Sequence, residues 1–278
     1  MSTQAADLVL YNANLMTMNP RCPRAELVAA GAGEIVWVGS NGDLDLFKGH
    51  AKLIDCEGKT VIPGFNDAHA HVLGYASRLL GVDCSPASVA SISDIESRIR
   101  QQAEFIPRGA WIKASGYNEF YLSESRHPTR HDLDRAAPHH PVKLTHRSLH
   151  ACVLNSQALF LAGISIETPD PPGGLIDRDV ETGEPNGILF GMNAYINEQV
   201  VPPLSEQEFS HGVKLVNQSF LSSGITSVQD ATVRNGIEQW QTFSKLKEKA
   251  GTLVPQIRMM LGLHSLDDFK ERGLYPGY

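Results

Sequence analysis

The sequence has few cysteines, and the four that it contains lie far apart, at Cys22, Cys56, Cys84 and Cys152. None of them belongs to a C-x-x-C pair, so the spacing indicates neither a disulfide framework nor a thiolate zinc site. Cysteine usage of this kind suits a reducing compartment better than an oxidising one. We therefore expect a cytoplasmic protein.

Long apolar runs and basic runs are also missing. No segment approaches the about 18 uninterrupted apolar residues that a membrane helix needs. The N-terminal stretch MSTQAADLVLYNANL lacks the basic start and the apolar core of a signal peptide. Because the formal net charge is −7 and no basic patch stands out, nucleic acid is an improbable partner. We expect a small-molecule substrate, with neither a nucleic acid nor a membrane as partner.

The rest of the composition describes a sizeable globular chain. Its 278 residues are 42% hydrophobic and 20% charged, which is enough material for one barrel or two smaller domains. Residues 7–62 alternate short apolar runs with Asn and Gly, which predicts β structure. The GAGEIV segment has Val36 where a dinucleotide-binding loop needs its third glycine. A hairpin turn at Gly31 to Gly33 is the better interpretation.

After residue 66 the pattern changes to alternating strands and helices. Apolar periodicity predicts helices over residues 91–106, 205–223 and 238–251, the first opened by a Ser93–Glu96 capping box and the second by Ser205–Glu208. AWIKASGYN, PVKLTHRS, GITSVQDA and PQIRMMLG are predicted strands, and residues 168–192 form an excursion with a hairpin. Such alternation predicts an α/β fold with a parallel sheet or barrel.

A His-x-His pair provides the first chemical signal. Side chains two positions apart in a strand point to the same side, so His69 and His71 are able to reach one ion. Imidazole suits Zn²⁺, Fe²⁺, Mn²⁺ or Co²⁺. The pair follows an apolar, buried-looking run, Thr60 to Phe65, at the strand end where barrel enzymes build active sites. Asp67 either orients a ligand or closes the turn. The pattern predicts a metal site at His69 and His71, against the alternative of two exposed loop histidines.

VIPGFNDAHAHV, residues 61–72, resembles the first-strand signature of the amidohydrolase superfamily. Residues 127–164 and 168–190 resemble one branch, the amidohydrolase family 3 hydrolases that include N-substituted formamide deformylases, and GITSVQDA resembles a later strand motif. The resemblance implies a divalent metal, Zn²⁺ above all. It also implies a partial (β/α)₈ TIM-type barrel over residues 61–278 and the N-terminal part of a small β-sandwich over residues 1–60.

The resemblance gives places to residues beyond the His-x-His pair. His150 matches the family's Gly-His motif, and either contacts the substrate or a developing oxyanion or supports another side chain. Leu149 replaces the usual glycine, which predicts a different local backbone. Of His146 and Arg147, one enters the pocket, or an outward salt bridge forms instead. The candidates for the substrate pocket are Tyr117, Asn118, Arg147, His150 and Asn155.

Other positions carry weaker signals. Many relatives have a glutamate after the Gly-x-Leu-x of the hairpin, where this chain has Gly191. Asp230, at the end of GITSVQDA, is a weaker pocket candidate. A solvated loop is the expected setting of four histidines whose own positions match no family motif: His127, His131, His139 and His140.

The superfamily implies a larger ligand set than the pair alone. It uses a bridging Lys or Glu, two histidines from later strands and an aspartate at the eighth strand that accepts the proton of metal-bound water. By resemblance those segments follow residue 278, and His264 matches no ligand position. We therefore expect the first half of the barrel, with roughly four or five of its strands, and the catalytic residue stays unknown.

Two functions from different classes remain open. One is metal-dependent hydrolysis of a non-peptide C–N bond, in an amide or formamide, by a truncated enzyme. The other is a catalytically inactive half-barrel that binds metal weakly or associates with another chain through its exposed barrel edge.

Overall fold

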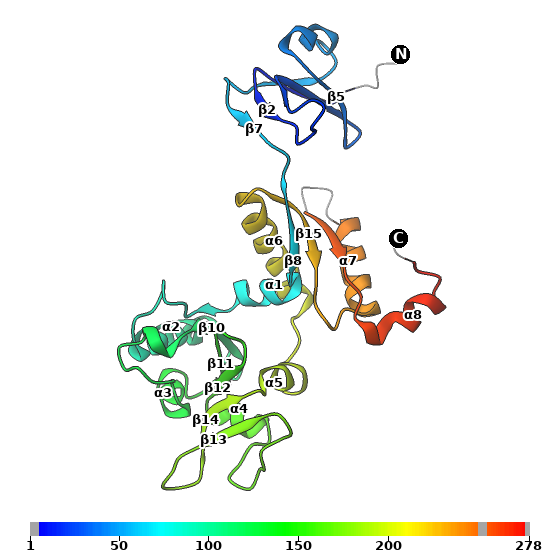
Figure 1. The fold of residues 1–278 in the computed structure, drawn as a ribbon. Coiled ribbons are helices and arrows are strands. Elements are labelled where there is room, and N and C mark those ends of the chain that lie inside the picture. The colour runs from blue at the N-terminus through cyan, green and yellow to red at the C-terminus, as the bar shows by residue number, and fades with distance from the viewer. Residues whose placement is uncertain (1–5, 250–254, 276–278) are drawn as a thin grey trace. The chain divides into compact units, whose positions relative to one another are not determined.

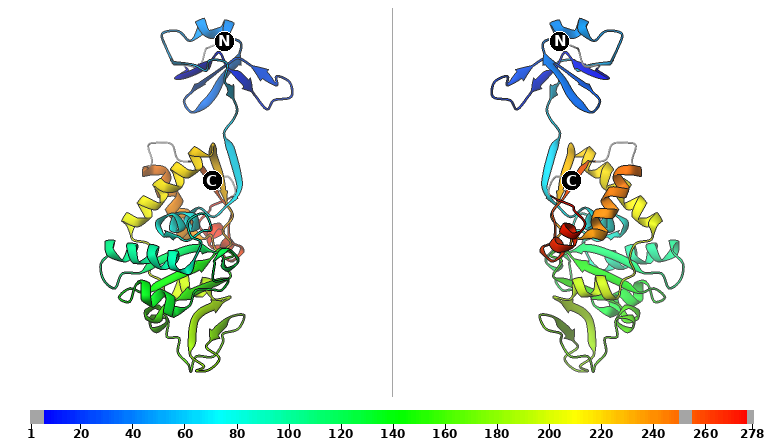
Figure 2. Two further views of the ribbon diagram at one scale, coloured as in Figure 1. Left: turned by 90° about the vertical axis from the view of Figure 1, so that its left-hand side faces the viewer. Right: turned by 90° about the vertical axis from the view of Figure 1, so that its right-hand side faces the viewer.

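The computed structural model describes residues 6–249 and 255–275. These residues divide into two compact units, each described by itself below (Figures 1 and 2). The first unit contains the described residues up to Ala68, together with Gly224–Gln229 and Gln256–Arg258, and the second contains the remainder.

Two small sheets form from the N-terminal residues. A four-stranded sheet has the order β5-β4-β1-β6 and a three-stranded sheet the order β3-β2-β7, so the predicted β structure is confirmed. The predicted hairpin is confirmed as well, because β4 and β5 pair antiparallel around Ala32 and Gly33, both with positive φ. The strands are β1 (Leu8–Tyr11), β2 (Asn14–Met16), β3 (Arg24–Ala25), β4 (Leu27–Gly31), β5 (Glu34–Gly39), β6 (Lys52–Asp55) and β7 (Thr60–Val61), with the 3₁₀ helix η1 (Asn41–Leu46) between β5 and β6.

The expectation of one buried strand over Thr60 to Phe65 is wrong. β7 ends at Val61, and β8 (Phe65–Ala70) begins only after Pro63 and Gly64. Proline has no N–H to donate to a ladder, so the run breaks there. Within this chain Ile62 is 41% and Phe65 is 55% exposed.

A six-stranded mixed sheet forms the centre of the second unit, with the order β13-β14-β12-β11-β10-β9. β9, β10 and β11 run parallel, whereas β12, β13 and β14 pair antiparallel. The hairpin predicted within residues 168–192 is confirmed by β13 and β14. The strands are β9 (Val82–Asp83), β10 (Ile112–Tyr117), β11 (Val142–His146), β12 (Ala151–Leu154), β13 (Leu175–Arg178) and β14 (Pro185–Phe190).

Alternating side chains of this sheet fill two separate cores. Val153 of β12 belongs to a core with α2 (Ile92–Phe105) and α3 (Arg130–Ala136). Its neighbours Cys152 and Leu154 belong to a second core with α4 (Ser156–Leu161) and α5 (Asn193–Gln199). Both faces are therefore covered, as the period of two along a strand requires.

Three strands elsewhere in the chain form their own sheet, with the order β16-β15-β8. β15 (Ile225–Asp230) and β16 (Gln256–Met259) follow the long excursion. The N–H of Phe65 donates to Gly224 O, and that of Ala231 donates to Ala70 O, so β8 and β15 run in the same direction side by side (Figure 1). The predicted strands AWIKASGYN and PVKLTHRS form β10 and β11, which pair parallel with each other in the six-stranded sheet and not in the sheet that contains β8.

The helices carry the caps that their sequences specify, with one correction. α6 begins after Ser205 with the predicted Ser205–Glu208 capping box, but α2 is capped by Ser91 and Asp94, two residues before the predicted pair. α1 and α6 pack together, with Tyr75 stacked on Phe220. The helices are α1 (Val72–Leu80), α2 (Ile92–Phe105), α3 (Arg130–Ala136), α4 (Ser156–Leu161), α5 (Asn193–Gln199), α6 (Glu206–Ser222), α7 (Ile237–Lys249) and α8 (Leu266–Glu271), with the 3₁₀ helices η2 (Glu119–Tyr121) and η3 (Leu263–Ser265).

The helix predicted over residues 238–251 is α7, which is described from Ile237 to Lys249; the last two predicted residues, 250 and 251, lie outside the described residues. No helix within the described ranges is long and apolar enough to span a bilayer.

Candidate functional site

The two histidines of the His-x-His pair lie together at the end of β8. His69 is the next-to-last residue of β8, and His71 is the N-cap residue of α1. Their ring centroids are 5.3 Å apart and the ring planes are 88° apart. Both residues are exposed. The structure thus brings the two imidazoles to one place, and the metal that they would bind stays a prediction.

His71 Nδ1 lies 3.1 Å from Thr232 Oγ1. Thr232 follows β15, and its N–H donates to the Asp230 carboxylate at 3.0 Å. With Nδ1 engaged, the Nε2 atom of His71 is the nitrogen left for a ligand. An imidazole held by its second nitrogen is the usual arrangement of a metal-binding histidine.

A second polar cluster lies where the parallel strands β10 and β11 end. Tyr117 Oη lies 2.9 Å from His127 Nδ1, and His146 Nε2 lies 2.9 Å from Glu119 Oε2. His127 Nε2 approaches the other oxygen of Glu119 to 3.7 Å. Ends of parallel strands are common ligand sites in α/β sheets, so this cluster is a second candidate for chemistry.

The hydrogen bonds of the cluster fix one tautomer of His146. The Ser148 N–H donates to His146 Nδ1 at 3.2 Å, which leaves the proton of a neutral ring on Nε2, facing Glu119. The two facing atoms, His146 Nε2 and Glu119 Oε2, are both buried and are not aligned for a hydrogen bond. Burial lowers the pKa of His146, and the nearby Glu119 charge opposes that shift only in part.

Burial and the negative charge of Glu119 raise the pKa of the Tyr117 phenol, so the phenol stays protonated at neutral pH and is available as a donor to His127. Tyr117 is fully buried. Asn118, the next residue, caps η2 by accepting the Phe120 N–H at 3.2 Å.

The remaining pocket candidates have different environments. The side chains of Arg147 and His150 are exposed, and the Arg147 N–H donates to Tyr117 O at 2.9 Å. Leu149 has a φ of +63°, so it adopts the left-handed conformation that glycine favours. These residues follow β11 of the six-stranded sheet, whereas His69 lies in β8, which belongs to the three-stranded sheet.

Asn155 holds the fold together around β11. It is fully buried, its oxygen accepts the N–H groups of Val142 and Ala158, and its amide donates to His140 O at 2.8 Å. Since its polar atoms are all used by the backbone, contact with a substrate remains only a prediction from resemblance.

The expectation of a solvated loop fails for three of the four histidines. His140 is 6% exposed and its Nδ1 lies 3.0 Å from Ala110 O, and His127 packs in the cluster against Phe190. His139 is exposed outside the helices and strands as expected, whereas His131 is exposed but lies in helix α3 instead of a loop. Glu119 was not among the predicted site residues, although its position just after a predicted strand end was a usable signal.

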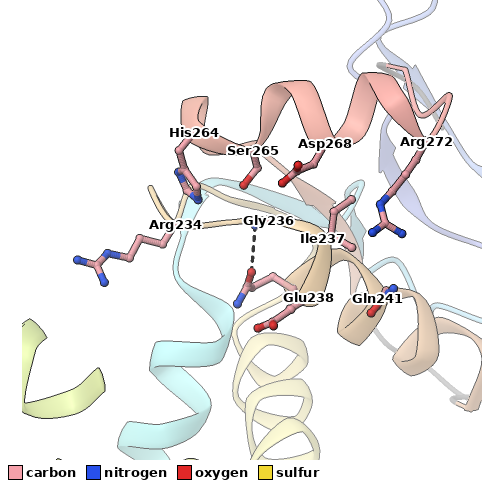
Figure 3. Close-up of a pocket in the computed structure, with 10 residues that line it drawn as sticks. Arg234, Gly236, Ile237, Glu238, Gln241, His264, Ser265, Asp268 and Arg272 are labelled. Carbon is pink, nitrogen blue, oxygen red and sulfur yellow. Dashed lines mark hydrogen bonds between the residues drawn. The ribbon is translucent and has the colours of Figure 1, made fainter. Parts of the chain in front are cut away.

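A cavity of about 830 Å³ lies beside the start of α7 (Figure 3). The Gly236 N–H at this helix start donates to Gln239 Oε1 at 3.0 Å. The two arginines and the two carboxylates of the lining balance in charge, which favours no ligand of one sign, and His264, which follows β16, also lines the cavity. The polar side chains at this cavity include Arg234, Glu238, His264, Ser265, Asp268 and Arg272.

Comparison with known proteins identifies the family of the chain. The Amidohydrolase family model matches residues 52–277, so the chain belongs to this family. It is 35% identical over 236 residues to the N-substituted formamide deformylase of Arthrobacter pascens, covering 83% of this chain and 43% of that protein. The chain therefore spans less than half the length of this curated relative.

Solved structures show the same fold. An uncharacterized metal-dependent hydrolase from Pyrococcus furiosus matches with a TM-score of 0.71 at 24% identity, over 96% of this chain and 52% of that one. A second metal-dependent hydrolase, from Pyrococcus horikoshii, matches with a TM-score of 0.70 at 22% identity and covers 96% of this chain and 51% of its own.

Proposed function

We propose that the chain is part of a metal-dependent hydrolase that cleaves a non-peptide C–N bond, in an amide or a formamide, with a metal-activated water. The observation that carries the proposal is the pair of imidazoles at the end of β8, 5.3 Å apart between ring centroids. Family membership and the likeness to a formamide deformylase support the substrate class.

The donor set fits a divalent metal such as Zn²⁺ in chemistry but supplies only part of a centre. Catalytic zinc sites commonly use three protein ligands. Across residues 6–249 and 255–275, no group of three or more His, Cys, Asp or Glu is arranged to hold a metal ion. His69 and His71 would hold the metal, and a bound divalent cation would make its water more acidic. The protein's part is to fix the two rings at the end of β8, with His71 held through Nδ1.

We also propose that β8, β15 and β16 belong to a (β/α)₈ barrel and that the N-terminal sheets belong to a β-sandwich. The parallel course of β8 and β15 and the TM-score of 0.71 support this architecture. The His-x-His pair then has the position at a strand's carboxyl end that barrel active sites use.

A second candidate function is association through a sheet edge. β8 and β16 are the edge strands of their sheet, and Phe65 at the start of β8 is 55% exposed. An exposed apolar edge favours pairing with another chain. Phe65→Lys should then shift sedimentation velocity toward the monomer. Phe160→Lys, at an 83% exposed site on α4, should not.

The enzyme proposal is tested in two stages. Co²⁺ absorption and Zn²⁺ titration should show binding that the double variant His69→Ala, His71→Ala loses. The chain is then mixed with the C-terminal part of the Arthrobacter relative, and formate or amine release is followed over a panel of N-formyl and N-acyl substrates. If the double variant binds metal as well as the native chain, the proposed metal site is wrong. If the metal-loaded mixture hydrolyses no substrate of the panel, the proposed substrate class is wrong.

A further inference from the structure

His71 lies at the N-cap position of α1, but its side chain does not cap the helix. It is the N-cap residue, yet it makes no side-chain capping hydrogen bond. Ser, Thr, Asp and Asn are the residues that normally satisfy the first amides of a helix. A histidine here breaks a local rule, and such departures are expected at functional sites.

The missing cap is supplied from β15. The N–H of Val72, the first residue of α1, donates to Asp230 Oδ2 at 2.7 Å across 158 residues of sequence. A carboxylate at the start of a helix also interacts favourably with the helix dipole. Asp230 therefore fixes the backbone directly after His71 and leaves the histidine ring without a capping role.

Asp230 is itself held firmly. It is 1% exposed, and its Oδ1 accepts the Thr232 N–H at 3.0 Å and the Asn235 amide at 2.8 Å. The same Asn235 amide donates to Met260 O at 3.0 Å, while the Met260 N–H donates to Asp230 O at 2.8 Å. One buried carboxylate thus joins the carboxyl ends of β8, β15 and β16.

Thr232 connects this network to the ring of His71. Its backbone is fixed by Asp230, and its Oγ1 lies 3.1 Å from His71 Nδ1. If Oγ1 accepts from Nδ1–H, the lone pair of a neutral ring is on Nε2, where a divalent cation binds. The opposite direction of donation would put the proton on Nε2 and block binding.

We propose that Asp230 and Thr232 are positioning residues for His71: Asp230 replaces it as the helix cap, and Thr232 selects the Nδ1–H tautomer that offers Nε2 to a divalent metal. The metal half of this inference rests on the proposed function; the tautomer half does not. A network that merely ties strand ends together would affect stability but leave the tautomer and the metal affinity unchanged.

The test uses the full chain without metal, at about pH 8.5, where an ordinary histidine is neutral. Long-range ¹H–¹⁵N NMR reports the tautomer of His71, whose signals are assigned by their loss in His71→Gln. We expect the Nδ1–H form in the native chain and in Thr232→Ser, which keeps the hydroxyl. A native Nε2–H form would overturn the proposal, and this result does not depend on the folding of any Thr232 variant.

Zn²⁺ affinity, measured by competition with a chromophoric chelator, is the second readout. Thr232→Val should lose the tautomer preference and bind Zn²⁺ ~10- to 100-fold more weakly than the native chain, the usual effect of removing a ligand's hydrogen-bond partner. Thr182→Val, which makes the same change in the hairpin, should retain native affinity. Native affinity in a folded Thr232→Val would contradict the proposal. If Thr232→Val does not fold, Thr232→Ala removes the same hydroxyl and carries the same expectation.

Failure of the proposed function has a different signature. If His71→Gln binds Zn²⁺ as well as the native chain, the metal site is lost, but the tautomer of His71 still tests the role of Thr232.

Discussion

Leu149 has a backbone conformation that is unfavourable for a residue with a side chain. Its φ is +63°, and a non-glycine residue in this region costs ~1–2 kcal/mol. Its side chain is 65% exposed, so little burial offsets the strain. The replaced family glycine predicted a changed backbone; the chain instead adopts the conformation that favours glycine.

We expect Leu149→Gly to raise the free energy of unfolding by ~0.5–1 kcal/mol, because relief of strain exceeds the entropy that glycine adds to the unfolded chain. Urea denaturation measures the change. Leu161→Gly, at a 55% exposed site on α4 without positive φ, should lower stability instead. A lower unfolding free energy for Leu149→Gly would show that the turn is not strained.

Lys143 is a buried cation without an anionic partner among its hydrogen bonds. Its Nζ donates to Thr145, Asn193 and Asn197 at 3.0, 2.6 and 2.8 Å. Burial lowers the pKa of Lys143 from 10.5 to about 8. Between these two pH values the unfolded chain holds the proton and the folded chain has released it. Stability therefore rises with pH across that window.

The measurement is the free energy of unfolding of the native chain and of Lys143→Met from pH 7 to 10, where we expect the native value to gain on the variant by at most ~1.4 kcal/mol per pH unit. The variant is needed because burial raises the pKa of the Cys152 thiol to about 11, and raised thiol pKa values lower stability above pH ~9. A constant difference between the two proteins would show that Lys143 titrates normally.

Among the helices and strands, the helix ends that depend on nearby residues were predicted correctly from the sequence. The Ser205–Glu208 box and the end of α6 before Gly224 follow from sequence alone, because cap and glycine act within a few residues. The start of α2 was misplaced because Ser91–Asp94 and Ser93–Glu96 both fit the capping pattern. The Glu124 carboxylate, 32 residues away, accepts the Ile92 N–H and adds support for the earlier start.

The assignment of strands to sheets could not be predicted in the same way. AWIKASGYN and PVKLTHRS are strands and pair parallel to each other, as the alternation of predicted strands and helices indicated. Apolar runs bounded by turns specify a strand but not its neighbours. β9 to β14 form a complete sheet between β8 and β15 in the sequence, and only tertiary pairing reveals the separation.

The hairpin end at Gly191 shows why one family feature is absent. Gly191 has a φ of +68°, and a Cβ at this position would lie 2.3 Å from Gly173 O. Neither glutamate nor any other side chain fits without movement of the hairpin. This steric limit accounts for the glycine of this chain at a position where the family resemblance led us to expect glutamate.

Gly191→Ala should therefore lower the free energy of unfolding by at least ~1 kcal/mol more than Gly183→Ala does. The two glycines share positive φ, but a Cβ at Gly183 meets only Ile166, at 3.7 Å. Thermal and urea unfolding of both variants give the difference. Equal decreases in the free energy of unfolding would contradict the prediction, because they would mean that the hairpin accommodates the added Cβ without loss of stability.

At the scale of the whole molecule, the candidate site was predictable in part. His69 and His71 are two positions apart, and this spacing predicted that their rings would lie close together. Thr232 and Asp230 contact His71 and Val72 across 161 and 158 residues. No local pattern joins positions so distant, so the support of the site emerged only from the pairing of β8 with β15.

We expect that the purified chain is not a competent amidohydrolase by itself. A zinc ion needs about three protein ligands for catalysis, and within the described part of the chain no group of three or more ligand-type side chains is arranged to hold it. Asp230, the carboxylate next to His71 in the fold, is committed to the α1 cap and to Asn235, so it does not serve as the proton acceptor of a metal-bound water.

With Zn²⁺ and the panel of N-formyl and N-acyl substrates, turnover should not exceed that of the His69→Ala, His71→Ala variant. Turnover well above that control would show that His150, His264, Asp230 or a second copy of the chain supplies the missing ligands. Activity proportional to the square of chain concentration would identify the second copy, whereas activity proportional to concentration and lost in His264→Ala or His150→Ala would identify the residue.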